Sequence, residues 1–154
     1  MSEYNVITPM VRNALGKELG PPVDYEVEKS AIRKVAEAMG DPNPLWQDEK
    51  YAGETKYSSV IAPPTFLASM RNPAHAEFIQ KLDIPLKRQL AGGVDIELLH
   101  PIKPRDIISV STKLAEANER TGSLGRMLIL VFETTFTNQE SQLVARLRQG
   151  LIRY

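Results

Sequence analysis

The segment RMLILVFETTFT, residues 126–137, decides the fold that this sequence predicts. Its side chains alternate between two sides with a period of two residues, which is the period of a β-strand. One side carries Leu128, Leu130, Phe132, Thr134 and Phe136, and the other carries Met127, Ile129, Val131 and Glu133. Because the first half of the segment is apolar on both sides, we expect a central strand that is covered on both faces.

Four further segments alternate in the same way and predict strands near residues 23–28, 94–98, 108–114 and 143–151. The sequence Asn-Gln-Glu-Ser at residues 138–141 favours a turn between the last two strands. The second half of the chain is therefore expected to form an antiparallel meander.

Helical patterns occur at residues 8–16, 30–40, 65–70 and 74–82. Ser30 is the expected N-cap of the second helix, and Asn72-Pro73 separates the last two. Helices first and strands later indicate an α+β fold, in which one antiparallel sheet wraps around a short central helix. With 154 residues and 42% apolar composition, we expect one domain over residues 1–154, with a leading helix and linker in residues 1–20.

Composition excludes several classes of function. The 19 basic and 19 acidic residues balance, so no net field attracts nucleic acid or an anionic membrane. The absence of cysteine and the presence of only two histidines argue against thiol chemistry and metal centres, and no cofactor is expected. No apolar run is long enough to span a membrane and residues 1–5 show no signal region, so a cytoplasmic protein is expected.

Two features direct attention to function. Residues 41–64 contain four prolines and no clear periodicity, and a loop of this length in a small domain often carries a site. The predicted sheet also has two edges that need covering, and a partner subunit that extends the sheet is one solution.

Three segments resemble MaoC-like dehydratases and (R)-specific enoyl-CoA hydratases. Residues 28–46 end in Gly40-Asp41-Pro42-Asn43-Pro44-Leu45-Trp46, similar to the family signature Ser/Thr-Gly-Asp-x-Asn-Pro-Leu-His. Ile61-Ala62-Pro63-Pro64-Thr65-Phe66-Leu67 resembles the start of the central helix in dehydratase domains related to fungal fatty-acid synthase. His100-Pro101-Ile102-Lys103-Pro104-Arg105-Asp106 is similar to the family turn Arg-Pro-Val-x-x-Gly-Asp. The resemblance implies a hot-dog fold.

The resemblance also implies chemistry on acyl thioesters. The family hydrates a trans-2-enoyl thioester, or runs the reverse dehydration, with an aspartate and a histidine that share one water molecule. Asp41 stands at the aspartate position, but Trp46 stands at the histidine position. Because an indole has a donor N–H and no base that titrates near neutral pH, Trp46 cannot replace the histidine.

A second catalytic group is also missing in this alignment. Active members have a glycine at the start of the central helix, and its N–H polarises the thioester carbonyl. Pro64 stands at that position, and proline has no N–H. The resemblance places the remaining substrate-binding positions in two short stretches, at Asn43, Trp46, Ala62, Pro63, Pro64, Thr65 and Phe66.

These losses resemble the non-catalytic subunit of heterodimeric (3R)-hydroxyacyl-thioester dehydratases, hydro-lyases of fatty-acid metabolism. The expected partner is a catalytic hot-dog subunit in a heterodimer or heterotetramer, with a homodimer as the alternative, and the expected ligand is a thioester of CoA or acyl-carrier protein. Two other functions stay open. The chain could be a self-sufficient hydratase that uses Asp41 or His100, or a module that binds acyl-CoA without chemistry.

Several single residues carry two interpretations. Asp41 is either a relic base or, as the turn sequence favours, a local acceptor for backbone N–H groups. Trp46 either lines an acyl tunnel or packs in the core or a dimer contact. His75 is expected to be a satisfied core or interface histidine, and His100 a surface or edge histidine.

Four basic residues could meet the phosphates of CoA or of a carrier protein, or could simply form a solvated sheet face, which is the commoner arrangement. They are Lys103, Arg105, Arg146 and Arg148.

Overall fold

The computed structural model describes residues 5–154. Its elements follow the order helices first and sheet second, apart from one short early strand. In chain order they are α1 (Pro9–Ala14), β1 (Val23–Glu26), α2 (Lys29–Ala38), η1 (Pro44–Trp46), α3 (Glu49–Gly53), η2 (Pro64–Ser69), α4 (Pro73–Gln80), β2 (Gln89–Leu98), β3 (Ile107–Gly122), β4 (Gly125–Thr137) and β5 (Leu143–Arg153).

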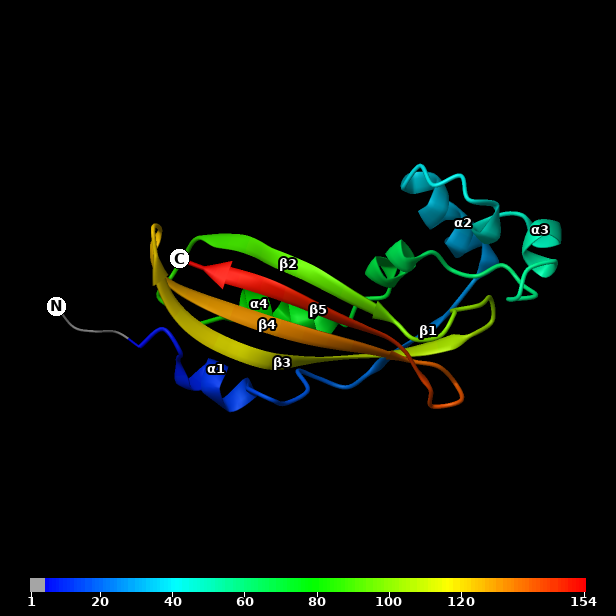
Figure 1. Ribbon diagram of the computed structural model, residues 1–154. Helices are drawn as coiled ribbons and strands as arrows, with labels where there is room; N and C mark the ends of the chain where they lie inside the picture. The colour runs from blue at the N-terminus through cyan, green and yellow to red at the C-terminus, as the bar shows by residue number, and fades with distance from the viewer. Residues whose placement is uncertain (1–4) are drawn as a thin grey trace.

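The five strands form one antiparallel sheet in the order β1-β3-β4-β5-β2. Figure 1 shows this sheet curving in front of α4, while α2 and α3 lie beyond the ends of the strands. The α+β class and the hot-dog arrangement are confirmed, and β4 is the central strand, as residues 126–137 predict. Strand β3 is longer than predicted, because its polar second half pairs with β4 up to Gly122 opposite Gly125.

The two faces of β4 differ. On the inner face Leu128, Leu130 and Phe132 are fully buried. On the outer face Ile129 and Val131 are only half-buried, so the prediction that both faces are covered is wrong. Cross-strand neighbours such as Ile152, opposite Ile129, shield these outer side chains in part without a covering layer.

The central helix is divided into η2 and α4, and Asn72 holds the break between them. Its side-chain oxygen accepts a hydrogen bond from the N–H of Ala74 at 3.0 Å, which caps α4. Its amide group donates to the carbonyls of Pro21 at 3.1 Å and Val110 at 3.2 Å. The central segment is thereby tied both to the linker before β1 and to β3.

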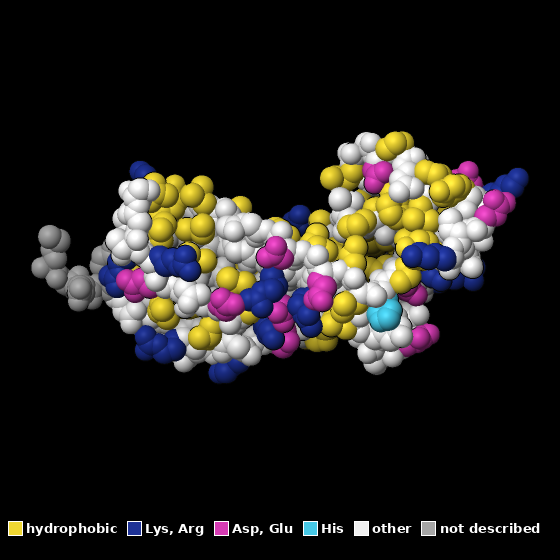
Figure 2. Space-filling model, viewed as in Figure 1, with side chains coloured by type: hydrophobic (Ala, Val, Ile, Leu, Met, Phe, Trp, Pro, Cys, Tyr) yellow, Lys and Arg dark blue, Asp and Glu magenta, His cyan; other side chains and the backbone are white. Residues whose placement is uncertain are grey.

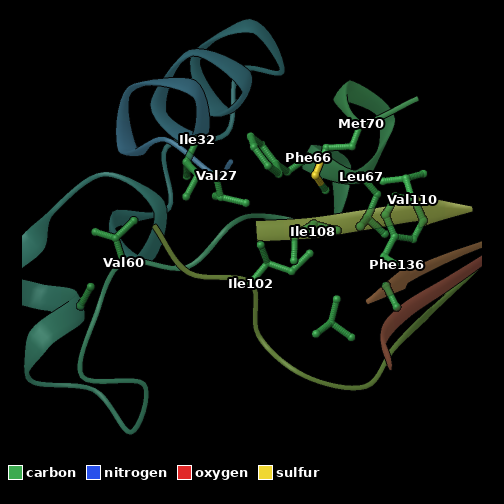
Figure 3. Close-up of a cluster of buried hydrophobic side chains, with 13 residues drawn as sticks. Val27, Ile32, Val60, Phe66, Leu67, Met70, Ile102, Ile108, Val110 and Phe136 are labelled. Carbon is green, nitrogen blue, oxygen red and sulfur yellow. The ribbon is translucent and has the colours of Figure 1, made fainter. Parts of the chain in front are cut away.

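Two apolar clusters cover the inner face of the sheet. One lies between α1, α4 and the middle of β3 and β4. The other lies at the end of the sheet beneath α2 and η2, where Ile32 lies beside Val27 and Leu67 lies beside Val110 and Phe136 (Figure 3). The second cluster fixes α2 and the loop that follows it to the sheet.

The local signals for helix α2 need one correction. The helix begins at Lys29 with Glu28 as its N-cap, and the side chain of Glu28 makes no capping hydrogen bond. The Ser30 cap is therefore wrong, because Ser30 lies within the first turn. The helix ends at Ala38 with Met39 as its C-cap, and Gly40 takes the left-handed conformation with φ of 64°, which favours glycine.

We predict that Asn72→Ala lowers the free energy of unfolding by about 2–4 kcal/mol, because it leaves buried carbonyls without a donor and removes the cap of α4. Urea denaturation followed by circular dichroism measures this change. Asn118→Ala, in an exposed part of β3, is the matched control. Equal stability of the two variants would contradict the role given to Asn72.

Candidate active-site loop and acyl cavity

The loop after α2 binds the Asp41 carboxylate with two donors from its own chain. The Oδ1 atom of Asp41 accepts from the backbone N–H of Asn43 at 3.1 Å, and Oδ2 accepts from the indole Nε1 of Trp46 at 2.7 Å. The Asp41 backbone carbonyl also accepts from the side chain of Gln47 at 2.9 Å. Both carboxylate oxygens are therefore used to organise the loop, which matches the geometry of a local acceptor.

Trp46 serves this loop in two ways. Its N–H donates to Asp41, and its half-buried ring packs against the apolar cluster beneath α2. Asn43 begins the short helix η1, where its side chain accepts from the N–H of Leu45 at 3.0 Å. The indole has no lone pair for accepting a proton, so the pair Asp41–Trp46 holds a carboxylate without a neighbouring base.

A separate cavity of about 690 Å³ lies between the central segment and the inner face of β2 and β5. Its walls are mainly apolar, with Pro64, Ile79 and Leu147 among them. The residues that line it come from η2, α4 and all strands except β1, together with Met39 at the end of α2. A cavity of this size falls in the range of small-molecule sites.

The residues expected to bind substrate are divided between these places. Pro64 and Thr65 line the cavity. Asn43 and Trp46 belong to the loop around Asp41, while Ala62 and Phe66 pack in or against the apolar cluster. Pro63 is the N-cap of η2, and the N–H of Phe66 donates to the Pro63 carbonyl at 2.9 Å.

The start of η2 supplies few N–H donors. Pro63 and Pro64 have none, so Thr65 carries the first N–H of this turn. A helix N-terminus usually presents several free N–H groups to an oxyanion, and two successive prolines reduce that capacity.

His75 is the unusual polar group of the cavity. Its ring packs on Phe132 with centroids 4.3 Å apart. Within residues 5–154, the buried Nε2 atom has no hydrogen-bond partner, so the expectation of a satisfied histidine is wrong. Burial disfavours the charged imidazolium and lowers the pKa of His75.

The sequence patterns did not single out the polar floor of the cavity. Thr112 and Thr134 are buried there and share a hydrogen bond of 2.8 Å between their hydroxyl groups. Thr134 lies on the predicted inner side of its strand, so the alternation pattern was the available signal. The distance between the central segment and the sheet, which creates the cavity, has no sequence signal.

The four candidate basic residues are not among those that line this cavity. Arg146 pairs with Glu97 at 2.7 Å, and Arg148 pairs with Glu133 at 3.2 Å and with Glu116. Figure 2 shows charged side chains of both signs gathered across the middle of the sheet's outer face.

The other candidates lie in the segment after β2. Lys103 donates to the carbonyl of Tyr57 at 2.9 Å, and Arg105 occupies the turn before β3 with φ of 75°. His100 is exposed. Across residues 5–154 no cluster of three or more metal-binding side chains occurs. No helix in this range is long and apolar enough to cross a membrane.

Comparisons with known proteins identify the family and the fold of this chain. Residues 13–147 match the model of the family described as FAS1-like, dehydratase domain region. A relative from Thermobifida fusca, called UPF0336 protein, is 33% identical over 131 residues, which cover 84% of this chain and 85% of that one.

Two solved structures from Mycobacterium tuberculosis share the fold. The ChsH1-ChsH2 complex matches with a TM-score of 0.75 and 19% identity over 88% of this chain and 85% of that chain. The C-terminally truncated HadBC (3R-hydroxyacyl-ACP dehydratase) complex matches with a TM-score of 0.72 and 19% identity over 86% of this chain and 93% of that chain.

We predict that Asp41→Ala destabilises the protein by about 1–3 kcal/mol, because the indole N–H and the Asn43 N–H lose a charged acceptor. Trp46 is the single tryptophan, so its fluorescence reports this loop directly. The emission should change in Asp41→Ala and stay as in the wild type in Asp24→Ala, on an exposed strand position. An unchanged emission in both variants would contradict the Asp41–Trp46 contact.

We predict that His75 makes stability depend on pH. The folded pKa lies below the ordinary value of about 6.5, so the unfolded chain binds more protons as the pH falls below that value. The free energy of unfolding should therefore fall between pH 7.5 and pH 5. Urea denaturation across this range should give a flatter profile for His75→Phe, while the exposed variant His100→Phe keeps the wild-type slope. Parallel profiles for all three proteins would refute this assignment.

Proposed function

Because the chain belongs to the FAS1-like dehydratase family, we propose that it is the non-catalytic subunit of an enoyl-thioester hydratase or (3R)-hydroxyacyl-thioester dehydratase. The observation that carries this proposal is the hydrogen bond from the Trp46 indole to Asp41. In the resemblance described above, Trp46 stands where the MaoC-like signature has a histidine.

The chemistry explains why this substitution matters. Adding water across an enoyl thioester needs one group that takes a proton from the water at C3 and one that manages the proton at C2. The hydrogen bonds of Asp41 within residues 5–154 come from a backbone N–H and an indole, neither of which accepts a proton. Together with Pro64 at the start of η2, this favours a subunit whose partner supplies the acid–base pair.

The cavity gives this subunit a role in substrate binding. Its apolar lining suits the hydrocarbon part of an acyl thioester, and its volume of about 690 Å³ is in the range of small-ligand pockets. One wall of the cavity is β2, where Val94 and Ile96 line it and are also exposed to solvent. A second subunit placed against β2 would close this wall and complete an acyl channel.

Strand β2 also supports the presence of a partner. It is an edge strand whose inner face leaves Val94 59%, Ile96 46% and Leu98 50% exposed. An unpaired edge with apolar side chains is a pairing site. Both solved structures named above are complexes of hot-dog chains, which supports a second hot-dog chain here.

A second candidate function is an acyl-thioester-binding module without chemistry. The cavity favours this function, because the single chain already forms the cavity without a partner. The third possibility, a self-sufficient hydratase based on Asp41 or His100, has less support because Asp41 is engaged by Trp46 and His100 is exposed.

We predict that the purified chain is inactive on a crotonyl-type thioester and that activity appears when it is co-expressed with a hot-dog chain carrying an intact Asp-x-Asn-Pro-x-His sequence. In that complex, Asp41→Asn in this chain should change kcat by no more than about twofold. The same change in the partner's motif should cost about 10²–10⁴-fold. Steady-state hydration assays measure both effects.

Two outcomes would reject this proposal. Partner-free activity that Asp41→Asn abolishes would establish the self-sufficient hydratase. Tight binding of acyl-CoA by calorimetry, with no activity in any co-expressed complex, would establish the binding module.

A further inference from the structure

We propose that the acidic outer face of β2 selects a partner strand bearing lysine or arginine and disfavours pairing with a second copy of this chain. This inference rests on the proposed function, in which a second hot-dog chain adds to β2. It concerns Asp95 and Glu97, two carboxylates on the strand edge that the proposed catalysis does not use.

The choice of β2 as the pairing edge follows from burial. The sheet has two edge strands, β1 and β2. The chain itself covers β1, whose Tyr25 packs against the apolar cluster and donates its hydroxyl to the carbonyl of Arg71. The inner face of β2 is largely exposed. A strand added at β2 would therefore bury apolar surface that a strand added at β1 would not.

The register of β2 against β5 places both acids on the outer face. Asp95 lies opposite Arg148, and Glu97 lies opposite Arg146. Arg146 pairs with Glu97, while Arg148 pairs with Glu116 and Glu133. Among the residues that the structure describes, the Asp95 carboxylate forms no ion pair or hydrogen bond, so its charge remains available at the edge.

A symmetric pairing of two copies that is centred on Asp95, Ile96 or Glu97 would bring these acids together. To keep the apolar inner faces continuous, each outer residue must lie opposite another outer residue. Centred on Ile96, the pairing sets Asp95 of each copy against Glu97 of the other. Centred on Asp95 or on Glu97, it sets that residue against itself. Directly opposed side chains lie about 4.5–5.5 Å apart at Cβ, where like charges destabilise the pair.

The arginines of the same face relieve this repulsion only at Glu97. Arg146 and Arg148 stand one strand behind the edge and already hold three carboxylates, those of Glu97, Glu116 and Glu133. A partner strand with lysine or arginine at the two facing positions would instead form an ion pair with Asp95 and a second ion pair with Glu97, which already pairs with Arg146. Charge complementarity at this seam therefore distinguishes a basic partner strand from a second copy.

The test mixes wild-type protein with the double variant Asp95→Lys/Glu97→Lys. In each of the three registers, the acidic residues of the wild type then face the lysines of the variant. In either homodimer, side chains of like charge face each other. Sedimentation should show a mixed dimer with a Kd at least about tenfold below that of either homodimer. The preference should disappear in 1 M salt, where the Debye length is about 3 Å.

The matched control is Asp24→Lys/Glu26→Lys, which makes the same change at the same spacing on the opposite edge strand, where both residues are exposed. The mixed dimer of this control variant with the wild type should be no tighter than the homodimers. If the Asp95→Lys/Glu97→Lys protein does not fold, the single variant Asp95→Lys replaces it, because this change breaks no ion pair. Its mixed dimer with the wild type should also be tighter than either homodimer, by a smaller factor.

Two results would overturn the inference. One is a wild-type homodimer as tight as the mixed dimer, and the other is equal mixing by the test and control variants. Either result can be obtained with a chain that still activates a catalytic partner. In that case the charge selection is rejected and the proposed function stands. Conversely, mixed-dimer formation without activation of any catalytic chain would support the charge selection and reject the proposed function.

Discussion

The structure depends on how one apolar sheet face is buried by a central segment that covers only part of it. Five strands present their inner side chains to one side, and η2 and α4 pack over β3 and β4. Asn72 fixes the segment there through its hydrogen bond to the Val110 carbonyl. The inner face of β2 stays uncovered, and the space between it and the central segment is the cavity. The cavity and the edge strand proposed to bind a partner therefore arise from the same incomplete cover of the sheet.

The loop around Asp41 follows from the same packing. Helix α2 buries Ile32 in the apolar cluster beneath it and also buries Ala36, and Gly40 then reverses the chain so that Asp41 begins the loop. A half-buried carboxylate needs donors, and here the indole of Trp46 provides one while its ring adds to the apolar cluster. The loop is thereby stable as a structural unit. Its polar atoms satisfy one another, and the cavity lies apart from them.

Much of the fold could be predicted because its signals are local. Alternation at residues 126–137 identified the central strand, and Asn72-Pro73 identified the break in the central helix. The Ser30 cap was wrong because several residues near a helix start can serve as caps, and packing of the apolar face sets the first turn. Full cover of Ile129 and Val131 was wrong because alternation shows apolarity and does not show what lies above a strand.

The site was less predictable because it depends on distances between segments far apart in sequence. Pro64 and Thr65 could be placed at the cavity through the resemblance, but Gln149 and Leu147 line it only because β5 lies beside β2. The unsatisfied Nε2 of His75 likewise depends on its packing over Phe132. A motif in one segment shows which groups are present, whereas the sheet order decides which of them meet.

The Trp46 indole differs in more than its lack of a base from the histidine that the MaoC-like resemblance leads one to expect at this position. An imidazole beside a carboxylate can change its charge near neutral pH, so such a pair keeps a titratable centre at the loop. An indole N–H is a permanent donor and does not titrate near neutral pH, and here it donates to the Asp41 carboxylate. The same two positions then act as a fixed hydrogen-bonded support for the loop. Without the Asp41 carboxylate, the half-buried indole N–H would lose its acceptor.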